Sequence, residues 1–185
     1  MTTKKERADL GELPAELESS RTKLELLALE TGPESWPKGE GLVKAPQIGV
    51  LAGLLIQKLH PELREDRMAY LWREKLTKAG RIDLGKPKKA GALLRLLAGV
   101  DFVVTLNWSA WQELTPRQRL ALLDHELEHC TTDQQSGAPR VRHHDLEEFT
   151  SVVERWGAWT PDLAEFKAAL EQLDIFEPAG VGETG

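Results

Sequence analysis

The chain has 185 residues, 41% of them hydrophobic, which is enough to bury the core of one domain. Its net charge of -6 argues against general nucleic-acid binding, and its single cysteine excludes an internal disulfide. No apolar run is long enough for a membrane span or a secretory signal region, so we expect a cytoplasmic protein without a membrane anchor.

Composition divides the chain into three regions. Residues 1–45 are weakly patterned, with several Gly and Pro residues, and we expect a flexible N-terminal segment there. Leucines at helical spacing within residues 13–29 also allow a short helix that docks on the domain or on a partner. Residues 46–176 form the predicted domain, and the Gly-rich residues 177–185 are expected to be a disordered tail.

Four elements are predicted in the first part of this domain. Residues 48–59 are apolar enough for a buried helix, which ends at His60 before a proline. Residues 61–78 have apolar side chains at helical spacing and predict the next helix, so His60 is interpreted as a structural residue at a helix junction. Residues 81–84 alternate and residues 102–106 are rich in β-branched residues, so both segments predict strands.

A compact basic group, Lys86, Lys88 and Lys89, lies between the two predicted strands of an otherwise acidic protein. We interpret this group as a solvated loop. The functional alternative is a surface that binds an acidic substrate segment or nucleic acid.

A further helix is predicted over residues 116–130. Thr115 is a suitable N-cap, a proline follows it at the first helical position, and Gln118 completes a capping box. The apolar residues that gather on one side of this helix are Leu120, Leu123, Leu127 and Cys130. Asp124 and Glu128 fall on another arc, which we expect to face solvent.

The last turns of this helix contain an H-E-x-x-H motif formed by His125, Glu126 and His129. Histidines at i and i+4 lie one above the other on a helix, so both imidazoles can bind one zinc ion at about 2 Å. Glu126 lies at the flank of that face, where it can accept a proton from a zinc-bound water without being a ligand. The motif therefore predicts a zinc site with Glu126 as the catalytic base.

The segment after the motif supplies further candidate ligands. Residues 131–140 are polar and contain Gly and Pro, which predicts a loop. Two histidines, His143 and His144, follow, and residues 145–156 have the apolar spacing of a helix. A last helix is predicted over residues 160–173. A helix, a loop and a second helix can bring a histidine or a glutamate back over the motif.

Several segments together resemble the phage metallopeptidase family. The resemblance covers roughly residues 46–159 and rests on segments 70–75, 84–86, 101–104, 124–130 and 144–149, with Trp111, Trp156, Gly157 and Trp159. It implies an α+β fold, in which a small zincin-like domain is mostly helical with a small sheet beside the H-E-x-x-H helix. It also implies a metal-dependent peptidase of phage or prophage origin, which would act in the host cytoplasm. By analogy with zincins, the strand at residues 81–84 or 102–106 would pair with an extended peptide.

A zinc site needs at least a third protein ligand. His144 is preferred, because its segment is similar to the downstream ligand segment of SprT-like zincins, in which a histidine precedes a helix with an aromatic residue. His143 is the next candidate. Glu147 and Glu148 also stay open, because thermolysin-type zincins take a glutamate from the following helix. The preferred metal set is His125, His129 and His144 around Zn²⁺.

The predicted function is hydrolysis of a peptide bond in a protein or peptide substrate by a zinc-activated water, with Glu126 as general base. Two other classes stay open. One is a non-catalytic zinc-stabilised module that binds a host protein, and the other is a regulatory peptidase specific for one host or phage regulator. Neither the substrate nor the oligomeric state follows from the sequence.

Overall fold

The computed structural model describes residues 9–28, 32–33, 36, 41–75, 77–78, 81–144 and 149–172, and these are the residues considered below. Its helical elements are η1 (Ala15–Ser20), α1 (Arg21–Leu27), α2 (Pro46–Leu59), η2 (Glu65–Arg67), α3 (Ala92–Ala98), α4 (Trp108–Glu113), α5 (Pro116–Glu128), α6 (Thr150–Trp156) and α7 (Pro161–Gln172). Its strands are β1 (Leu42–Lys44), β2 (Met68–Arg73), β3 (Thr77–Lys78), β4 (Arg81–Ile82), β5 (Gly85–Lys89), β6 (Phe102–Asn107), β7 (Cys130–Thr132) and β8 (Pro139–Val141). Within these ranges, no helix is long and apolar enough to cross a membrane.

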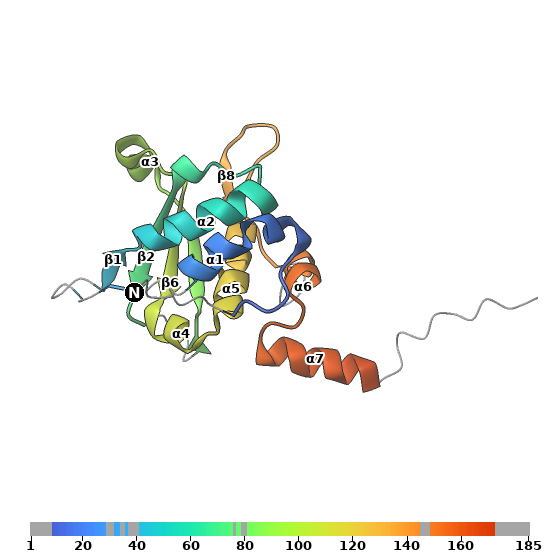
Figure 1. Cartoon of the computed structure of the whole chain (residues 1–185). Coiled ribbons are helices and arrows are strands. Elements are labelled where there is room, and N and C mark those ends of the chain that lie inside the picture. Colours follow the sequence, from blue (N-terminus) through green and yellow to red (C-terminus); the bar gives the residue numbers. More distant parts are fainter. Residues whose placement is uncertain are drawn as a thin grey trace, which may run out of the picture.

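A four-stranded sheet in the order β1-β2-β6-β5 forms the centre of this α+β domain. β2 runs parallel to β6, whereas β1 and β5 are antiparallel to their neighbours. Along β2, the side chains of Met68, Tyr70 and Trp72 are buried and alternate with less buried ones. α2 packs on the buried face beside α5 and crosses in front of the strands in Figure 1. The sheet therefore has a core face, which meets α2 and α5, and an opposite open face.

Several predicted elements are confirmed. The helices predicted over residues 48–59 and 116–130 are α2 and α5, and the strand predicted over residues 102–106 is β6. The predicted capping box is present at the start of α5. Thr115 Oγ1 accepts the backbone N–H of Gln118 at 3.3 Å, and the Gln118 side chain accepts the backbone N–H of Thr115 at 3.0 Å. This cap fixes where the helix begins.

The two C-terminal helices are also present. Of the helix predicted over residues 145–156, the structure has Thr150–Trp156 as α6, and residues 145–148 lie outside the described residues. The helix predicted over residues 160–173 is α7, which projects away from the sheet in Figure 1.

The helix predicted over residues 61–78 is wrong, because this segment contains η2 and the strands β2 and β3. Met68, Tyr70 and Trp72 point to the core at a period of two, and β2 lies directly beside the buried strand β6. Aromatic residues favour strands, and burial against the sheet outweighs the helical spacing of the leucines.

The loop predicted for Lys86, Lys88 and Lys89 is also wrong, because these residues form the edge strand β5. Lysine and proline are common on edge strands, where they discourage pairing with other chains. The strand predicted over residues 81–84 is shorter than expected and pairs as β4 with β3. The loop predicted over residues 131–140 contains the strands β7 and β8 of a hairpin.

Residues 9–28 join the same core as the predicted domain. Leu10, Leu13, Leu17 and Leu24 are at most 6% exposed, and β1 pairs with β2. The expectation of a flexible N-terminal segment therefore does not hold for residues 9–28 or for β1, and η1 and α1 supply the docked helix that residues 13–29 allowed. Residues 1–8 and the expected tail at 177–185 lie outside the described residues.

Candidate metal centre

The H-E-x-x-H motif lies at the C-terminal end of α5. His125 and Glu126 belong to the last turns of the helix, and His129 is its C-cap residue. Leu123 and Leu127 of the same turns are completely buried in the core. Because these leucines fix the rotation of the helix, both histidines are held on its partly exposed side.

Three imidazole nitrogens converge at this end of α5. The Nε2 atom of His144 lies 3.2 Å from Nε2 of His125 and 3.1 Å from Nε2 of His129. A tetrahedral zinc ion at about 2.0–2.1 Å from each ligand would hold the ligand nitrogens roughly 3.3 Å apart. The spacing of these nitrogens fits that requirement, and the three side chains form a group that could hold a metal ion.

The hairpin of β7 and β8 returns the chain from the end of α5 to His144. Just after β8, the backbone N–H of Arg142 donates to the His129 carbonyl oxygen at 2.9 Å. In return, His129 Nδ1 lies 2.8 Å from the Arg142 carbonyl oxygen. Because a carbonyl oxygen only accepts, the ring proton of His129 lies on Nδ1, which leaves the Nε2 lone pair available to a metal.

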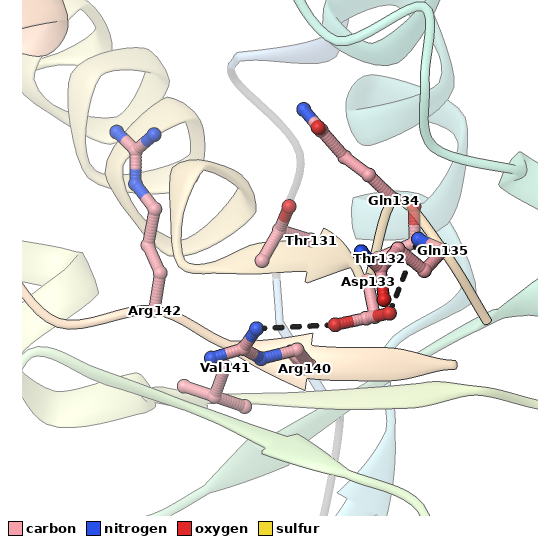
Figure 2. A pocket seen from close by; sticks show the side chains of 8 residues that line it. All are labelled: Thr131, Thr132, Asp133, Gln134, Gln135, Arg140, Val141 and Arg142. Atoms are coloured by element: carbon pink, nitrogen blue, oxygen red, sulfur yellow. Dashed lines mark hydrogen bonds and ion pairs between the residues drawn. The ribbon is translucent and has the colours of Figure 1, made fainter. Parts of the chain in front are cut away.

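Phe149 is a common apolar support for the three imidazoles. Its ring is completely buried, and its centroid lies 5.4 Å from that of His125, 4.7 Å from that of His129 and 5.0 Å from that of His144. The Arg142 guanidinium covers the Phe149 ring, 4.5 Å from its centroid. In Figure 2, the Arg142 side chain extends away from the hairpin and runs beside a helix. The segment that carries His144 is thus fixed by the backbone of Arg142, which bonds to His129, and by the side chain of Arg142, which packs on Phe149.

Glu126 is buried against the edge strand of the sheet. Its residue surface is only 3% exposed, and a methyl group added at Gly85 of β5 would overlap its carboxylate. A larger residue where β5 passes Glu126 would therefore displace this carboxylate. Gly85 lies within the segment that resembles the metallopeptidase family, but its residue type alone did not predict this contact.

A second cluster of metal-ligand residue types lies on a neighbouring face of α5. His60 Nε2 is 2.6 Å from Asp124 Oδ1, and the other Asp124 oxygen accepts from Arg155 Nε at 2.8 Å and from Trp156 Nε1 at 2.7 Å. The next turn of α5 carries Glu128, which pairs with Arg155 at 3.0 Å and with the guanidinium of Arg142.

The solvent-facing arc expected for Asp124 and Glu128 is wrong. Asp124 is completely buried and the Glu128 side chain is only 14% exposed, because α6 places Arg155 and the indole N–H of Trp156 over this side of the helix. Burial raises the pKa of Asp124, but the hydrogen bond and charge of His60 and the charge of Arg155 outweigh it. The pKa therefore lies below its ordinary value. His60 has the structural role that the sequence predicted.

The remaining candidate ligands are placed as follows. His143 is exposed, and the metal-capable groups found among the described residues contain His144 and not His143. Glu147 and Glu148 lie outside the described residues. The single cysteine, Cys130, is buried as expected, and burial raises the pKa of its thiol.

A polar hollow of about 440 Å³ lies on the hairpin of β7 and β8. The residues that line it are Thr131, Thr132, Asp133, Gln134, Gln135, Arg140, Val141 and Arg142. Figure 2 shows the ion pair between Arg140 and Asp133 across this hollow, with a separation of 3.3 Å. The hollow thus lies on the surface of residues 131–142, the segment that brings His144 to α5.

A family model described as "Putative phage metallopeptidase" matches residues 41–173 of the chain. This range includes the sheet, α5, the hairpin and all three converging histidines. Comparison with curated proteins and with solved structures gives no significant match. Because the matched range covers most of the 185 residues, the chain belongs to this phage metallopeptidase family, whose name implies a metal ion and a peptide or protein substrate.

Proposed function

We propose that this protein is a zinc-dependent peptidase in which His125, His129 and His144 hold the metal. The observation that carries the proposal is the convergence of their Nε2 atoms, with His144 3.1 and 3.2 Å from the other two, on the helix that also bears Glu126. Three protein ligands leave one tetrahedral position open, which is typical of catalytic zinc sites, whereas structural sites use four.

Glu126 is the general base of the proposed reaction. When bound, zinc supplies a Lewis acid that polarises the scissile carbonyl and lowers the pKa of water. Glu126 accepts the proton of the attacking water and passes it to the leaving amine. Close packing against Gly85 restricts the rotamers of Glu126, which supports a carboxylate held ready for this transfer.

The peptide would lie along β5 in this proposal. Neither segment first expected to pair with the peptide fits: β6 has partners on both sides, and β4 belongs to another sheet. Among the described strands, β5 has β6 as its only hydrogen-bonded partner, although β8 also lies close to it, and its first residue, Gly85, touches Glu126. A substrate backbone beside this end of β5 would be close to both the base and the histidines.

The first experiment is the zinc content of the protein purified without added metal, compared with that of His129→Ala. About one zinc per parent chain and little in a still-folded variant would support the site. Absence of zinc from the parent, even after equimolar zinc is supplied, would contradict the proposal.

The second experiment tests catalysis with Glu126→Gln, using a denatured protein and a phage-host lysate as substrates. We expect turnover to fall by about a thousandfold or more while zinc content and circular dichroism stay unchanged. Glu113→Gln, an exposed residue of α4, is the matched control and should cleave like the parent. Equal cleavage by Glu126→Gln would remove this residue from the mechanism.

Gly85→Ala tests whether the position of the Glu126 carboxylate matters, because it leaves the carboxylate itself chemically unchanged. The added methyl group would displace the Glu126 carboxylate, so we expect kcat to fall by about ten- to a hundredfold with an unchanged zinc content. Gly91→Ala is the control, because a methyl group there meets no atom within 4 Å. An undiminished kcat in Gly85→Ala would show that the close packing of Glu126 does not matter for turnover.

A further inference from the structure

The open face of the four-stranded sheet carries a second hollow, of about 210 Å³. Its lining residues are Leu42, Arg73, Lys75, Asp83, Lys86, Lys88 and Thr105. Lys86 pairs in register with Thr105 of β6, which in turn pairs with Leu71 of β2. Lys88 lies two residues after Lys86 on the same face of β5, because side chains alternate along a strand. We call this feature the cationic hollow.

The charge of the cationic hollow is opposite to that of the whole protein. Its lining has four basic residues and one acidic residue, whereas the chain has a net charge of -6. The ion pairs between described residues use other arginines and His60, and none involves Arg73, Lys75, Lys86 or Lys88. Four cations thus face one another with a single carboxylate, and their mutual repulsion favours an anionic ligand.

We propose that the cationic hollow binds acidic side chains of the protein substrate, a role that rests on the proposed peptidase function. Carboxylates are small enough to enter a hollow of about 210 Å³ and complement its charge. Nucleic acid is disfavoured, because the lining contains no aromatic side chain on which bases could stack and the protein as a whole is acidic.

β5 connects the cationic hollow to the metal centre. Gly85 touches Glu126 from the core face of the sheet, and the next residue, Lys86, lines the hollow on the open face. A peptide extended beside β5 would place alternate side chains on the two faces of the sheet. Its acidic residues would then meet Lys86 and Lys88 while its backbone lies beside Glu126. The peptidase would accordingly select acidic segments.

The test is binding of fluorescent peptides to full-length, zinc-loaded Glu126→Gln, measured by anisotropy. One peptide has Asp or Glu at every second position, and the other has Asn or Gln at those positions. We expect the acidic peptide to bind at least about tenfold more tightly, and added salt to reduce this preference. The double substitution Lys86→Glu and Lys88→Glu should remove the preference.

The matched control is Lys23→Glu with Lys58→Glu, two exposed lysines elsewhere that produce the same change in net charge. This control should keep the preference within about twofold. Equal affinity for both peptides, an unchanged preference after reversal of Lys86 and Lys88, or tighter binding of single-stranded DNA than of the acidic peptide would each overturn the proposal. Because the readout is the preference between two peptides, its failure can be told apart from a failure of the zinc-content and turnover experiments that test the peptidase itself.

Discussion

Two clusters of metal-ligand residue types lie on neighbouring faces of α5, and they differ in what surrounds them. His125, His129 and His144 bring three ring nitrogens toward one point, and a backbone carbonyl orients one of the rings. His60, Asp124 and Glu128 are equally close together, but arginines and an indole N–H already bond to the two carboxylates. A cation there would have to displace Arg155 from both carboxylates.

Proximity of ligand residue types therefore does not by itself identify a metal site. The hydrogen bonds and ion pairs that these residues already make must also be considered. Asp124 and Glu128 each precede a histidine of the motif in sequence, so one helix carries both clusters. We interpret the ion-pair cluster as the part that fixes α5 against α2 and α6, and the histidine cluster as the part that binds metal. The following predictions test this division.

Asp124→Ala should give the largest loss of stability. It removes one of the two carboxylates that pair with the largely buried Arg155, and it removes the acceptor of His60 and Trp156. We expect the free energy of unfolding of the metal-free protein to fall by about 3–5 kcal/mol, measured with urea. Asp162→Ala, at an exposed position of α7, should change it by roughly 0.5 kcal/mol or less. A loss below about 1 kcal/mol for Asp124→Ala would mean that the ion-pair cluster does not hold the fold.

His144→Ala should show the opposite behaviour. Loss of a ligand should weaken zinc binding by at least about a hundredfold, measured by competition with a chromophoric chelator. The metal-free protein should unfold within about 1 kcal/mol of the parent, because the side chain of His144 is exposed. His143→Ala is the matched control and should keep zinc. If the two variants exchange these results, His143 is the ligand.

Arg142→Met tests the residue that joins the two clusters. The substitution removes the guanidinium from Glu128 and from the Phe149 ring but leaves the carbonyl group that bonds to His129. We expect zinc affinity to fall by about tenfold or less, since the substitution acts only through the position of the segment. Arg140→Met in the same hairpin should leave the affinity unchanged. A loss as large as that of His144→Ala would show that the side chain of Arg142 dominates the geometry of the site.

Acidification should affect the two clusters differently, and of these changes it should alter the free energy of unfolding least. Imidazoles bind metal only when neutral, so zinc should dissociate as the pH falls below about 6. The pKa of Asp124 is lower in the folded protein, so its contribution to stability is complete above the unfolded value of about 3.9 and is lost as the pH falls through the folded value. The metal-free protein should therefore change its unfolding free energy by only about 1 kcal/mol between pH 7 and pH 5. A larger loss over this range would assign the stability to histidines instead of Asp124.

Local signals predicted the parts of the fold that depend on neighbours in sequence. Thr115 and Gln118 cap α5 as expected, because a capping box acts within one turn. The strand β6 followed from a run of apolar and β-branched residues. β2 was mistaken for a helix, because its apolar residues satisfy both periods and only the neighbouring strand β6 decides between them. The lysines of β5 gave no strand signal, since an edge strand can be polar.

The part of the candidate site that lies on the single helix α5 could be predicted from the sequence. His125, Glu126 and His129 followed from the motif, whereas the choice of His144 over His143 depended on family resemblance. Within the part of the chain that the structure describes, His144 and not His143 is grouped with the pair. Gly85 could not be found in this way, because it acts through its missing side chain. Arg142 could not be found either, because its carbonyl and its guanidinium meet His129, Phe149 and Glu128 only in the folded chain. The burial of Asp124 depends on Arg155 and Trp156, which come from a helix much later in the chain.

The hairpin of β7 and β8 also determines whether the entropy cost of closing the loop between His129 and His144 belongs to folding or to metal binding. Joining His129 to His144 through a metal would otherwise require closure of the long loop between them. In this molecule, strand pairing and the two hydrogen bonds between His129 and Arg142 hold the ends of that loop together without the metal. The ordering of the loop is therefore part of folding. Metal exchange at this centre should resemble the docking of an ion on a rigid receptor, in contrast to the metal-driven folding of a zinc finger.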